Sequence, residues 1–186
     1  MWESSFRAAA MTEAVLGLGT NLGDREAYLA GALDRLAATQ GIRLDEVSRV
    51  YRSAPWGLSD QPDFLNLCVR IETSLNPEEL LRACKQVEAD LGRQSRQRWG
   101  PREIDIDLLL IEGVDFDTPN LTIPHRRLME RRFVLEPLSE LEPEWVIDGI
   151  EVSDLARYLR EDAPDQMCEP DEKATQRVSQ LRGSVM

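Results

Sequence analysis

The sequence predicts an α+β fold whose elements follow the order strand, helix, strand, strand, helix, strand. Three observations support this order. Apolar residues alternate with a period of two in the predicted strands, they recur at helical spacing in the predicted helices, and glycine, proline and N-cap residues mark the element ends. A chain of 186 residues can bury one good core but is short for two domains. We therefore expect a single domain with additional segments at its ends.

The first three segments are a strand, a helix and a second strand. The short apolar run at 14–18 indicates a buried strand. Asp24 then offers an N-cap, three leucines recur at helical spacing, and Gly41 ends the helix. Residues 42–52 are rich in Val, Ile and Tyr and are predicted to form the second strand. The loop 53–63 that follows contains two prolines and a glycine, and its length points to a functional loop.

The second half of the predicted sheet is better marked. Apolar residues occupy every second position of 65–71, which is typical of a half-buried strand. Asn76, a following proline and Glu79 form the strongest helix-start signal in the chain. Gly92 ends that helix, and an arginine-rich loop leads to the fourth strand at 104–111.

This order is the split βαβ arrangement of ferredoxin-like folds, so we expect an antiparallel sheet with helices on one face. Further helices at 131–140 and 152–160 are expected as extra C-terminal elements. We divide the chain into an N-terminal extension at 1–12, a folded domain at 13–162 and a tail at 163–186. The tail is polar and poor in aromatic residues, so we expect it to be disordered.

Composition restricts the kind of partner. The formal net charge of −12 disfavours nucleic acids and anionic membranes, which attract positively charged surfaces. The three cysteines show neither a disulfide framework nor zinc-ligand spacing. No apolar stretch has the length of a signal peptide core or a membrane span. We expect a cytoplasmic protein that binds no nucleic acid and no membrane.

An aspartate pair in the fourth strand is the main candidate for chemistry. Asp105 and Asp107 are two residues apart, so their side chains share one face and their Cα atoms lie roughly 6.5 Å apart. Mg²⁺ prefers a few carboxylate oxygens together with substrate phosphates. With Arg93 and Arg102 nearby, the segment fits phosphoryl transfer. The spacing alone fits a surface acid pair neutralised by arginines equally well.

Other residues are weaker candidates. His125, the single histidine, stands among arginines, where a phosphate contact competes with the more common structural role. Phe64 and Asn66 share the open face of the third strand, and Trp56 lies in the loop before them. An aromatic ring beside an amide suits a planar heterocycle. Packing beneath the long loop is the plainer alternative.

Four stretches carry a family resemblance: GLGTNLGD, SAPWGLSDQPDFLN, RWGPREIDIDLLL and IPHRRLMERRFVLEPL. Together they resemble the 6-hydroxymethyl-7,8-dihydropterin pyrophosphokinases of folate biosynthesis, over roughly Val15 to Pro143. The resemblance implies a ferredoxin-like fold and transfer of pyrophosphate from ATP to the hydroxymethyl group of the pterin, giving AMP and the pterin diphosphate. It also implies two Mg²⁺ ions with ATP as co-substrate. We expect a monomer that binds these small molecules.

The resemblance also assigns roles to individual residues. Asp105 and Asp107 are expected to bind the metal, and Arg93 and Arg102 are the expected catalytic arginines. The residues expected at the pterin are Ser53, Ala54, Phe64, Asn66 and Phe133, with Trp56 beside them. The residues expected at ATP are Glu88, Arg98, Trp99, Ile106, His125 and Arg131.

Three other functions are less favoured. A non-catalytic pterin- or nucleotide-binding module would have no need of Asp105, Asp107 and Arg102, which are all present. A ferredoxin-like RNA-binding domain needs a basic sheet face and is opposed by the negative charge. A metal-dependent phosphohydrolase shares the site chemistry but would release inorganic phosphate.

Overall fold

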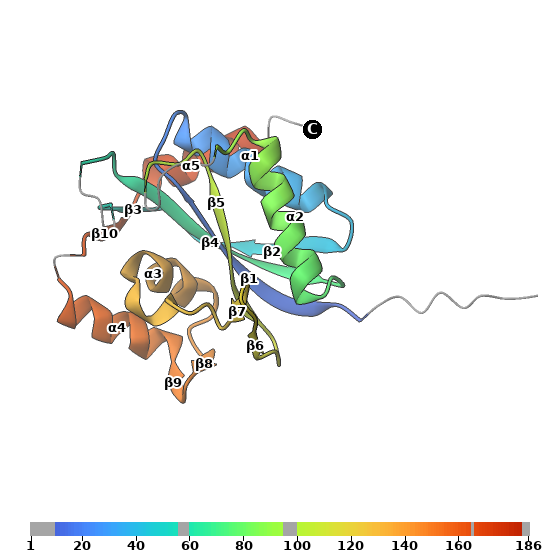
Figure 1. Cartoon of the computed structure of the whole chain (residues 1–186). Helices are drawn as coiled ribbons and strands as arrows, with labels where there is room; N and C mark the ends of the chain where they lie inside the picture. Colours follow the sequence, from blue (N-terminus) through green and yellow to red (C-terminus); the bar gives the residue numbers. More distant parts are fainter. Residues whose placement is uncertain (1–9, 56–59, 95–99, 165, 184–186) are drawn as a thin grey trace, which may run out of the picture.

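A computed structural model of the chain describes residues 10–55, 60–94, 100–164 and 166–183 (Figure 1). Its strands are β1 (Thr12–Thr20), β2 (Ile42–Val47), β3 (Tyr51–Ser53), β4 (Phe64–Thr73), β5 (Asp105–Ile111), β6 (Phe116–Asp117), β7 (Thr122–Ile123), β8 (Val146–Ile147), β9 (Ile150–Glu151) and β10 (Cys168–Pro170). Its helices are α1 (Arg25–Ala38), α2 (Pro77–Asp90), α3 (Arg132–Leu141), α4 (Val152–Asp162) and α5 (Glu172–Gly183), with a 3₁₀ turn η1 (Leu128–Glu130).

The main sheet confirms the predicted ferredoxin-like α+β fold. Its strands follow the order β10-β3-β4-β1-β5, β2 also pairs with β4, and every pair is antiparallel. The single strand expected at 42–52 is divided into β2 and β3. The chain leaves the ladder at Ser48, whose N–H donates to the Cys68 carbonyl and whose Oγ accepts the Cys68 N–H, each at 3.0 Å.

Both predicted helix starts are confirmed. The Asp24 side chain accepts a hydrogen bond from Ala27 N at the start of α1. At α2, Asn76 Oδ1 accepts from Glu79 N while the Glu79 carboxylate accepts from Asn76 N. This capping box satisfies two backbone N–H groups that an isolated helix end leaves unpaired. It fixes the start of the helix that brings two charged side chains to the sheet.

Helices cover parts of both faces of the sheet. On one face, α1, α2 and α5 enclose the larger core, which includes the alternate strand residues Leu65, Leu67, Val69 and Ile71. On the other face, α3 and α4 pack over Cys68 and the end of β5. The face that we expected to be open is therefore partly covered by α3 and α4. Within the described ranges, no helix is both long enough and apolar enough to cross a membrane.

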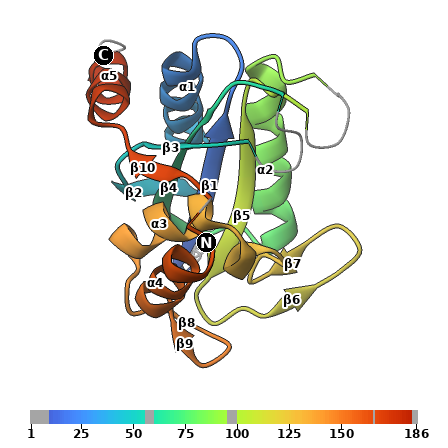
Figure 2. The same cartoon turned by 90° about the vertical axis from the view of Figure 1, so that its left-hand side faces the viewer.

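The tail expected to be disordered is instead largely ordered, which corrects our division of the chain at residue 163. β10 extends the sheet next to β3, and α5 packs against α1 (Figure 2). Ala174 and Val178 lie four residues apart, so they share one side of α5, and both are buried in the larger core. Asp171 Oδ1 accepts from Ala174 N at 3.0 Å and caps the helix. The polar average composition of the tail did not reveal these two apolar residues on one side of a helix.

Candidate active site

A cavity of about 620 Å³ lies on the sheet face beside α3. Residues of β1, β4 and β5 and of the first turn of α3 line it. Gly19 faces both Asn66 and Asp105 across the ladder, and a Cβ at Gly19 would lie 3.1 Å from Asn66 Oδ1. Glycine at this position of β1 therefore leaves room for the Asn66 side chain.

Asp105 stands at the centre of a cluster of cations. It pairs with Arg102 and with Arg93, whose Nη1 lies 2.6 Å from Asp105 Oδ1, while Lys85 Nζ is 3.9 Å away. Burial alone would raise the pKa of Asp105, but the three positive charges outweigh it and hold that pKa below its ordinary value. Asp105 is therefore an ionised carboxylate at neutral pH.

Glu88 is a buried carboxylate that bonds to two cations of this cluster. Its side chain is 2% exposed and does not line the cavity. One carboxylate oxygen accepts from Ile106 N at 2.7 Å and from Lys85 Nζ at 2.8 Å, and the other pairs with Arg93. Glu88 thus ties α2, β5 and the arginine-rich loop together. The Ile106 side chain is buried in the larger core, and its N–H is engaged by Glu88.

Asp107 is less strongly paired. Among the described residues, its nearest cation is Arg131, with 3.7 Å between Asp107 Oδ2 and Arg131 Nη1. Burial and the neighbouring charge of Asp105 raise the pKa of Asp107. Within the described part of the chain, Arg131 Nε has no hydrogen-bond partner. The pair Asp107 and Arg131 therefore retains capacity for a cation and an anion, respectively.

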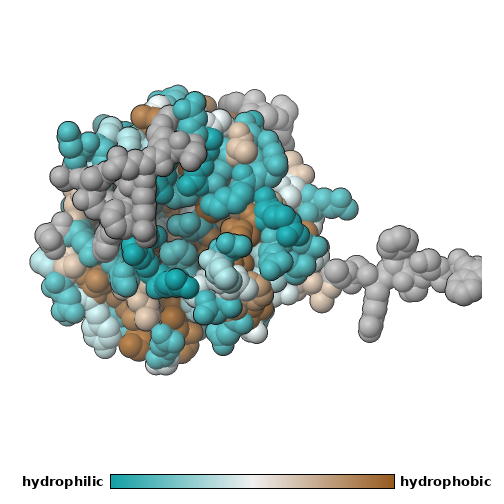
Figure 3. Space-filling model, in the orientation of Figure 1, coloured by the Kyte–Doolittle hydropathy of each residue, from teal (hydrophilic) through white to brown (hydrophobic). Residues whose placement is uncertain are grey.

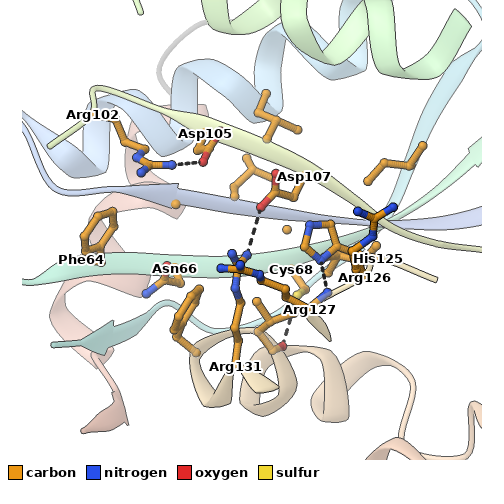
Figure 4. A pocket seen from close by; sticks show the side chains of 18 of the residues that line it. Phe64, Asn66, Cys68, Arg102, Asp105, Asp107, His125, Arg126, Arg127 and Arg131 are labelled. Carbon is orange, nitrogen blue, oxygen red and sulfur yellow. Dashed lines mark hydrogen bonds and ion pairs between the residues drawn. The ribbon is translucent and has the colours of Figure 1, made fainter. Parts of the chain in front are cut away.

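His125 lies on the wall opposite Asn66 and Phe64 (Figure 4). Burial and the charges of nearby arginines, chiefly Arg131, lower its pKa to about 4. Its Nδ1 accepts from Arg127 N at 3.3 Å, so the ring hydrogen is assigned to Nε2. At neutral pH the side chain is an uncharged donor.

The predicted heterocycle-binding residues gather at one end of the cavity. Ser53, Ala54, Phe64, Asn66 and Phe133 all line it. Asn66 Nδ2 donates to Ser53 Oγ at 2.9 Å, so Ser53 fixes which way the amide points. In Figure 4, Asp107 and Arg131 lie between this end and His125. The cavity thus has an aromatic end and a basic end with the carboxylates between them.

Some predicted residues cannot be placed, and others were missed. Trp56, Arg98 and Trp99 lie outside the described residues. Lys85 was not predicted, although its position three residues before Glu88 on one helix was a usable signal. Asn21 was also missed. Its side chain accepts from Arg102 N at 2.9 Å and donates to Gln61 Oε1 at 3.0 Å, which links two loops beside the cavity.

Asp105 and Asp107 would need further ligands to complete the coordination of a hard cation. The described residues contain no group of three or more histidine, cysteine, aspartate or glutamate side chains that would hold a metal unaided. Two carboxylates on one strand face, with phosphate oxygens completing the coordination, match the ligand preference of Mg²⁺. The residues present therefore fit an ion that arrives with a phosphorylated ligand.

Comparisons with known proteins agree with this chemistry. The family model for 7,8-dihydro-6-hydroxymethylpterin-pyrophosphokinase (HPPK) matches residues 15–143. A 2-amino-4-hydroxy-6-hydroxymethyldihydropteridine pyrophosphokinase of Methylorubrum extorquens is 53% identical over 139 residues, 75% of this chain and 88% of the relative. One of the same name from Bacillus subtilis is 46% identical over 128 residues, 69% of this chain and 77% of the relative.

A solved structure supports the fold. The crystal structure of Plasmodium falciparum HPPK-DHPS with STZ-DHP aligns with 86% of this chain at a TM-score of 0.65 and 16% identity. The present chain spans 45% of that longer chain. At this identity the likeness concerns the fold alone.

Proposed function

Because this chain belongs to the 7,8-dihydro-6-hydroxymethylpterin-pyrophosphokinase family, we propose that the cavity beside α3 is the active site for the reaction of that family. The enzyme transfers pyrophosphate from ATP to 6-hydroxymethyl-7,8-dihydropterin in folate biosynthesis, and AMP is the second product. One observation carries the placement: a single cavity is lined by both aspartates, by the aromatic end with its oriented amide, and by several arginines.

The pterin occupies the aromatic end in this proposal. Phe64 and Phe133 offer faces for a flat bicyclic ring, and Asn66 offers an acceptor and a donor to its edge. The Asn66 amide is already oriented by Ser53, so little side-chain entropy is lost on binding. This placement directs the hydroxymethyl group toward the carboxylates.

The triphosphate of ATP occupies the middle and the basic end. Arg93 and Arg102, now paired with Asp105, would exchange that carboxylate for phosphate oxygens when ATP binds. Arg131, which lines the cavity, offers the positive charge of its guanidinium, and neutral His125 offers a hydrogen bond that adds no charge. The arrangement neutralises the phosphates without a covalent nucleophile.

Asp105 and Asp107 would hold Mg²⁺, expected as two ions, together with the phosphates. When bound, the metal withdraws electron density from the phosphate oxygens and so stabilises charge in the transition state. When Arg93 and Arg102 leave Asp105 to bind phosphate, the Asp105 carboxylate becomes free to bind the metal.

The reaction itself is an in-line displacement. The hydroxymethyl oxygen attacks the β-phosphorus and loses its proton to solvent. The bond from that phosphorus to the oxygen bridging to the α-phosphate breaks, so AMP leaves. The chain's own contribution is to position the two substrates and to neutralise charge with Arg93 and Arg102. The expected roles of Trp56 at the pterin and of Arg98 and Trp99 at ATP stay predictions from the resemblance. We further expect a cytoplasmic monomer.

Product analysis tests this proposal. Purified protein is mixed with Mg²⁺, ATP and 6-hydroxymethyl-7,8-dihydropterin, and nucleotides and pterins are followed by chromatography. We expect equal amounts of AMP and pterin diphosphate, dependent on both substrates, and their loss in Asp107→Ala. ADP would indicate simple phosphoryl transfer, and inorganic phosphate formed without pterin would indicate hydrolysis; either result contradicts the proposal.

A further inference from the structure

We propose that residues 166–170, here called the C-terminal strap, position the pterin-binding end of the cavity, and that the strap is a determinant of pterin affinity. This inference rests on the proposed placement of the pterin. The family match ends at residue 143, so the strap and the helix α5 that follows it lie outside the matched region. In the cartoon, β10 lies next to β3 at the edge of the sheet (Figure 2).

The strap first contacts the wall formed by α3. Gln166 accepts from the backbone N–H of Arg132 through Oε1 at 3.2 Å, and from Arg132 Nη1 through its carbonyl at 3.0 Å. Arg132 precedes Phe133, which lines the cavity. One end of the strap is thus bonded to the first turn of the helix that supplies an aromatic wall.

The strap then reaches the opposite wall. Met167 O accepts from Ala54 N at 3.3 Å, and Cys168 pairs with Ser53 in the ladder between β10 and β3. Ala54 and Ser53 both line the cavity, and Ser53 orients the Asn66 amide. Five consecutive residues therefore connect two walls that are about 80 residues apart in the sequence, as the numbers of Ser53 and Phe133 show.

β3 depends on this support. It has only three residues, and its other edge pairs with β4 from Tyr51 to Ser53. Without β10 it would be a very short edge strand, with unpaired backbone groups and little to resist fraying. Displacement of Ser53 would release the Asn66 amide, because the hydrogen bond between them sets its orientation.

α5 anchors the strap to the body of the protein. Asp171 N donates to Val50 O at 2.7 Å, and Val50 N donates to Thr175 Oγ1 at 2.9 Å. Two residues of α5, Ala174 and Val178, are buried in the larger core. The strap is therefore held at both ends and along its length, as a positioning element requires.

Glu169 allows a test that leaves the cavity lining intact. The bond from Ala54 N to Met167 O makes Cys168 and Ser53 a non-hydrogen-bonded pair, so the next pair, Glu169 and Arg52, exchanges both backbone hydrogen bonds. Glu169→Pro removes the N–H from that pair. Glu169→Ala is the matched control, since it keeps the N–H at the same exposed position.

We expect folded Glu169→Pro to have a pterin KM raised by roughly five- to tenfold, the effect of about one hydrogen bond, with an ATP KM changed by less than about twofold. The Kd of the pterin, measured by fluorescence with a non-hydrolysable ATP analogue, should rise equally. Glu169→Ala should match the wild type. A purely structural role would lower thermal stability without this split between the two substrates.

A folded Glu169→Pro protein with wild-type KM and Kd for the pterin would overturn the proposal, as would equal losses for both substrates. If this variant does not fold, Gln166→Ala, which removes the acceptor for Arg132 N, should raise the pterin KM and Kd by about threefold, roughly the effect of a weakened hydrogen bond; no change would overturn the proposal. If the wild-type protein binds the pterin but forms no AMP, the proposed reaction is contradicted. The Kd of the pterin in the variants then still tests the role of the strap.

Discussion

Among the described residues, Asp105 pairs with three cations, whereas Asp107 pairs with one, Arg131, at 3.7 Å. The two carboxylates therefore differ in proton affinity, with the pKa of Asp105 lowered against the cost of burial and the pKa of Asp107 raised by burial and by Asp105. A cation brought by the substrate would relieve the repulsion between them. In the proposed reaction, the pair would therefore bind the metal together with the phosphates.

Asp105→Ala should abolish catalysis while retaining pterin binding. The change removes a proposed metal ligand and the carboxylate that Arg93 and Arg102 share, while Arg93 keeps its pair with Glu88, so we expect kcat to fall by on the order of 10²–10³-fold or more. Steady-state kinetics and pterin fluorescence would measure the two effects. Asp117→Ala is a control at an exposed carboxylate. A kcat near that of the wild type would refute the metal role of Asp105.

His125 should remain neutral through the physiological pH range. Its pKa of about 4 in the folded protein lies below the ordinary value of 6.5. Between these two values the unfolded chain binds a proton that the folded protein does not, so this residue makes stability fall as the pH drops from about 6.5 toward 4. As the only histidine, it gives an unambiguous NMR titration. A midpoint near 6.5 in the folded protein would contradict this environment.

At the scale of elements, the same helix performs two tasks. α2 contributes Cys84 and Val87 to the larger core, while Lys85 and Glu88 on a neighbouring side reach the charged cluster. The capping box at Asn76 fixes where the helix begins and so fixes the rotation of both groups about its axis. Helix register thereby determines where Arg93 and the Ile106 N–H are held.

α5 should contribute measurably to stability, as an ordered part of the fold. Val178→Ala removes about two buried methyl-sized groups, and we expect the free energy of unfolding to fall by about 2 kcal/mol. Gln176→Ala, at an exposed position of the same helix, should change it by less than about 0.5 kcal/mol. Urea denaturation followed by circular dichroism measures both. Equal, negligible effects would indicate that α5 does not pack on the core.

At the scale of the whole molecule, one sheet carries two cores. β1, β4 and β5 contribute residues to the larger core on one face and to the smaller core under α3 and α4 on the other. The surface seen in Figure 3 is largely hydrophilic, with smaller hydrophobic areas between. The chain as a whole has a net charge of −12, but several arginines line the cavity. This local positive charge suits a small anion.

The two cores should unfold together because they share these strands. Three free, buried cysteines report on different regions: Cys84 in the larger core, Cys68 in the smaller core and Cys168 in β10. Pulsed thiol labelling across a urea gradient should give one midpoint for all three. An earlier midpoint for Cys168 alone would show that the C-terminal segment detaches first.

The sequence by itself determined the local structure and the main chemical groups. Periodicity and caps predicted the order of the elements from β1 to β5, except that the one strand expected at 42–52 is divided into β2 and β3. Spacing put Asp105 and Asp107 on one face. These properties depend on neighbours within a few residues, so they can be predicted without the fold. The family resemblance added the residues that line the aromatic end, five of which the structure brings into one cavity.

Only the tertiary structure decided the rest. It placed α3 on the second sheet face, folded the polar tail into β10 and α5, and put Glu88 behind the cavity lining. Each of these outcomes depends on contacts between residues far apart in the sequence, such as Gln166 with Arg132 or Val178 with the larger core. Composition averages over a segment and cannot show that two buried side chains and a few long-range hydrogen bonds suffice to order it.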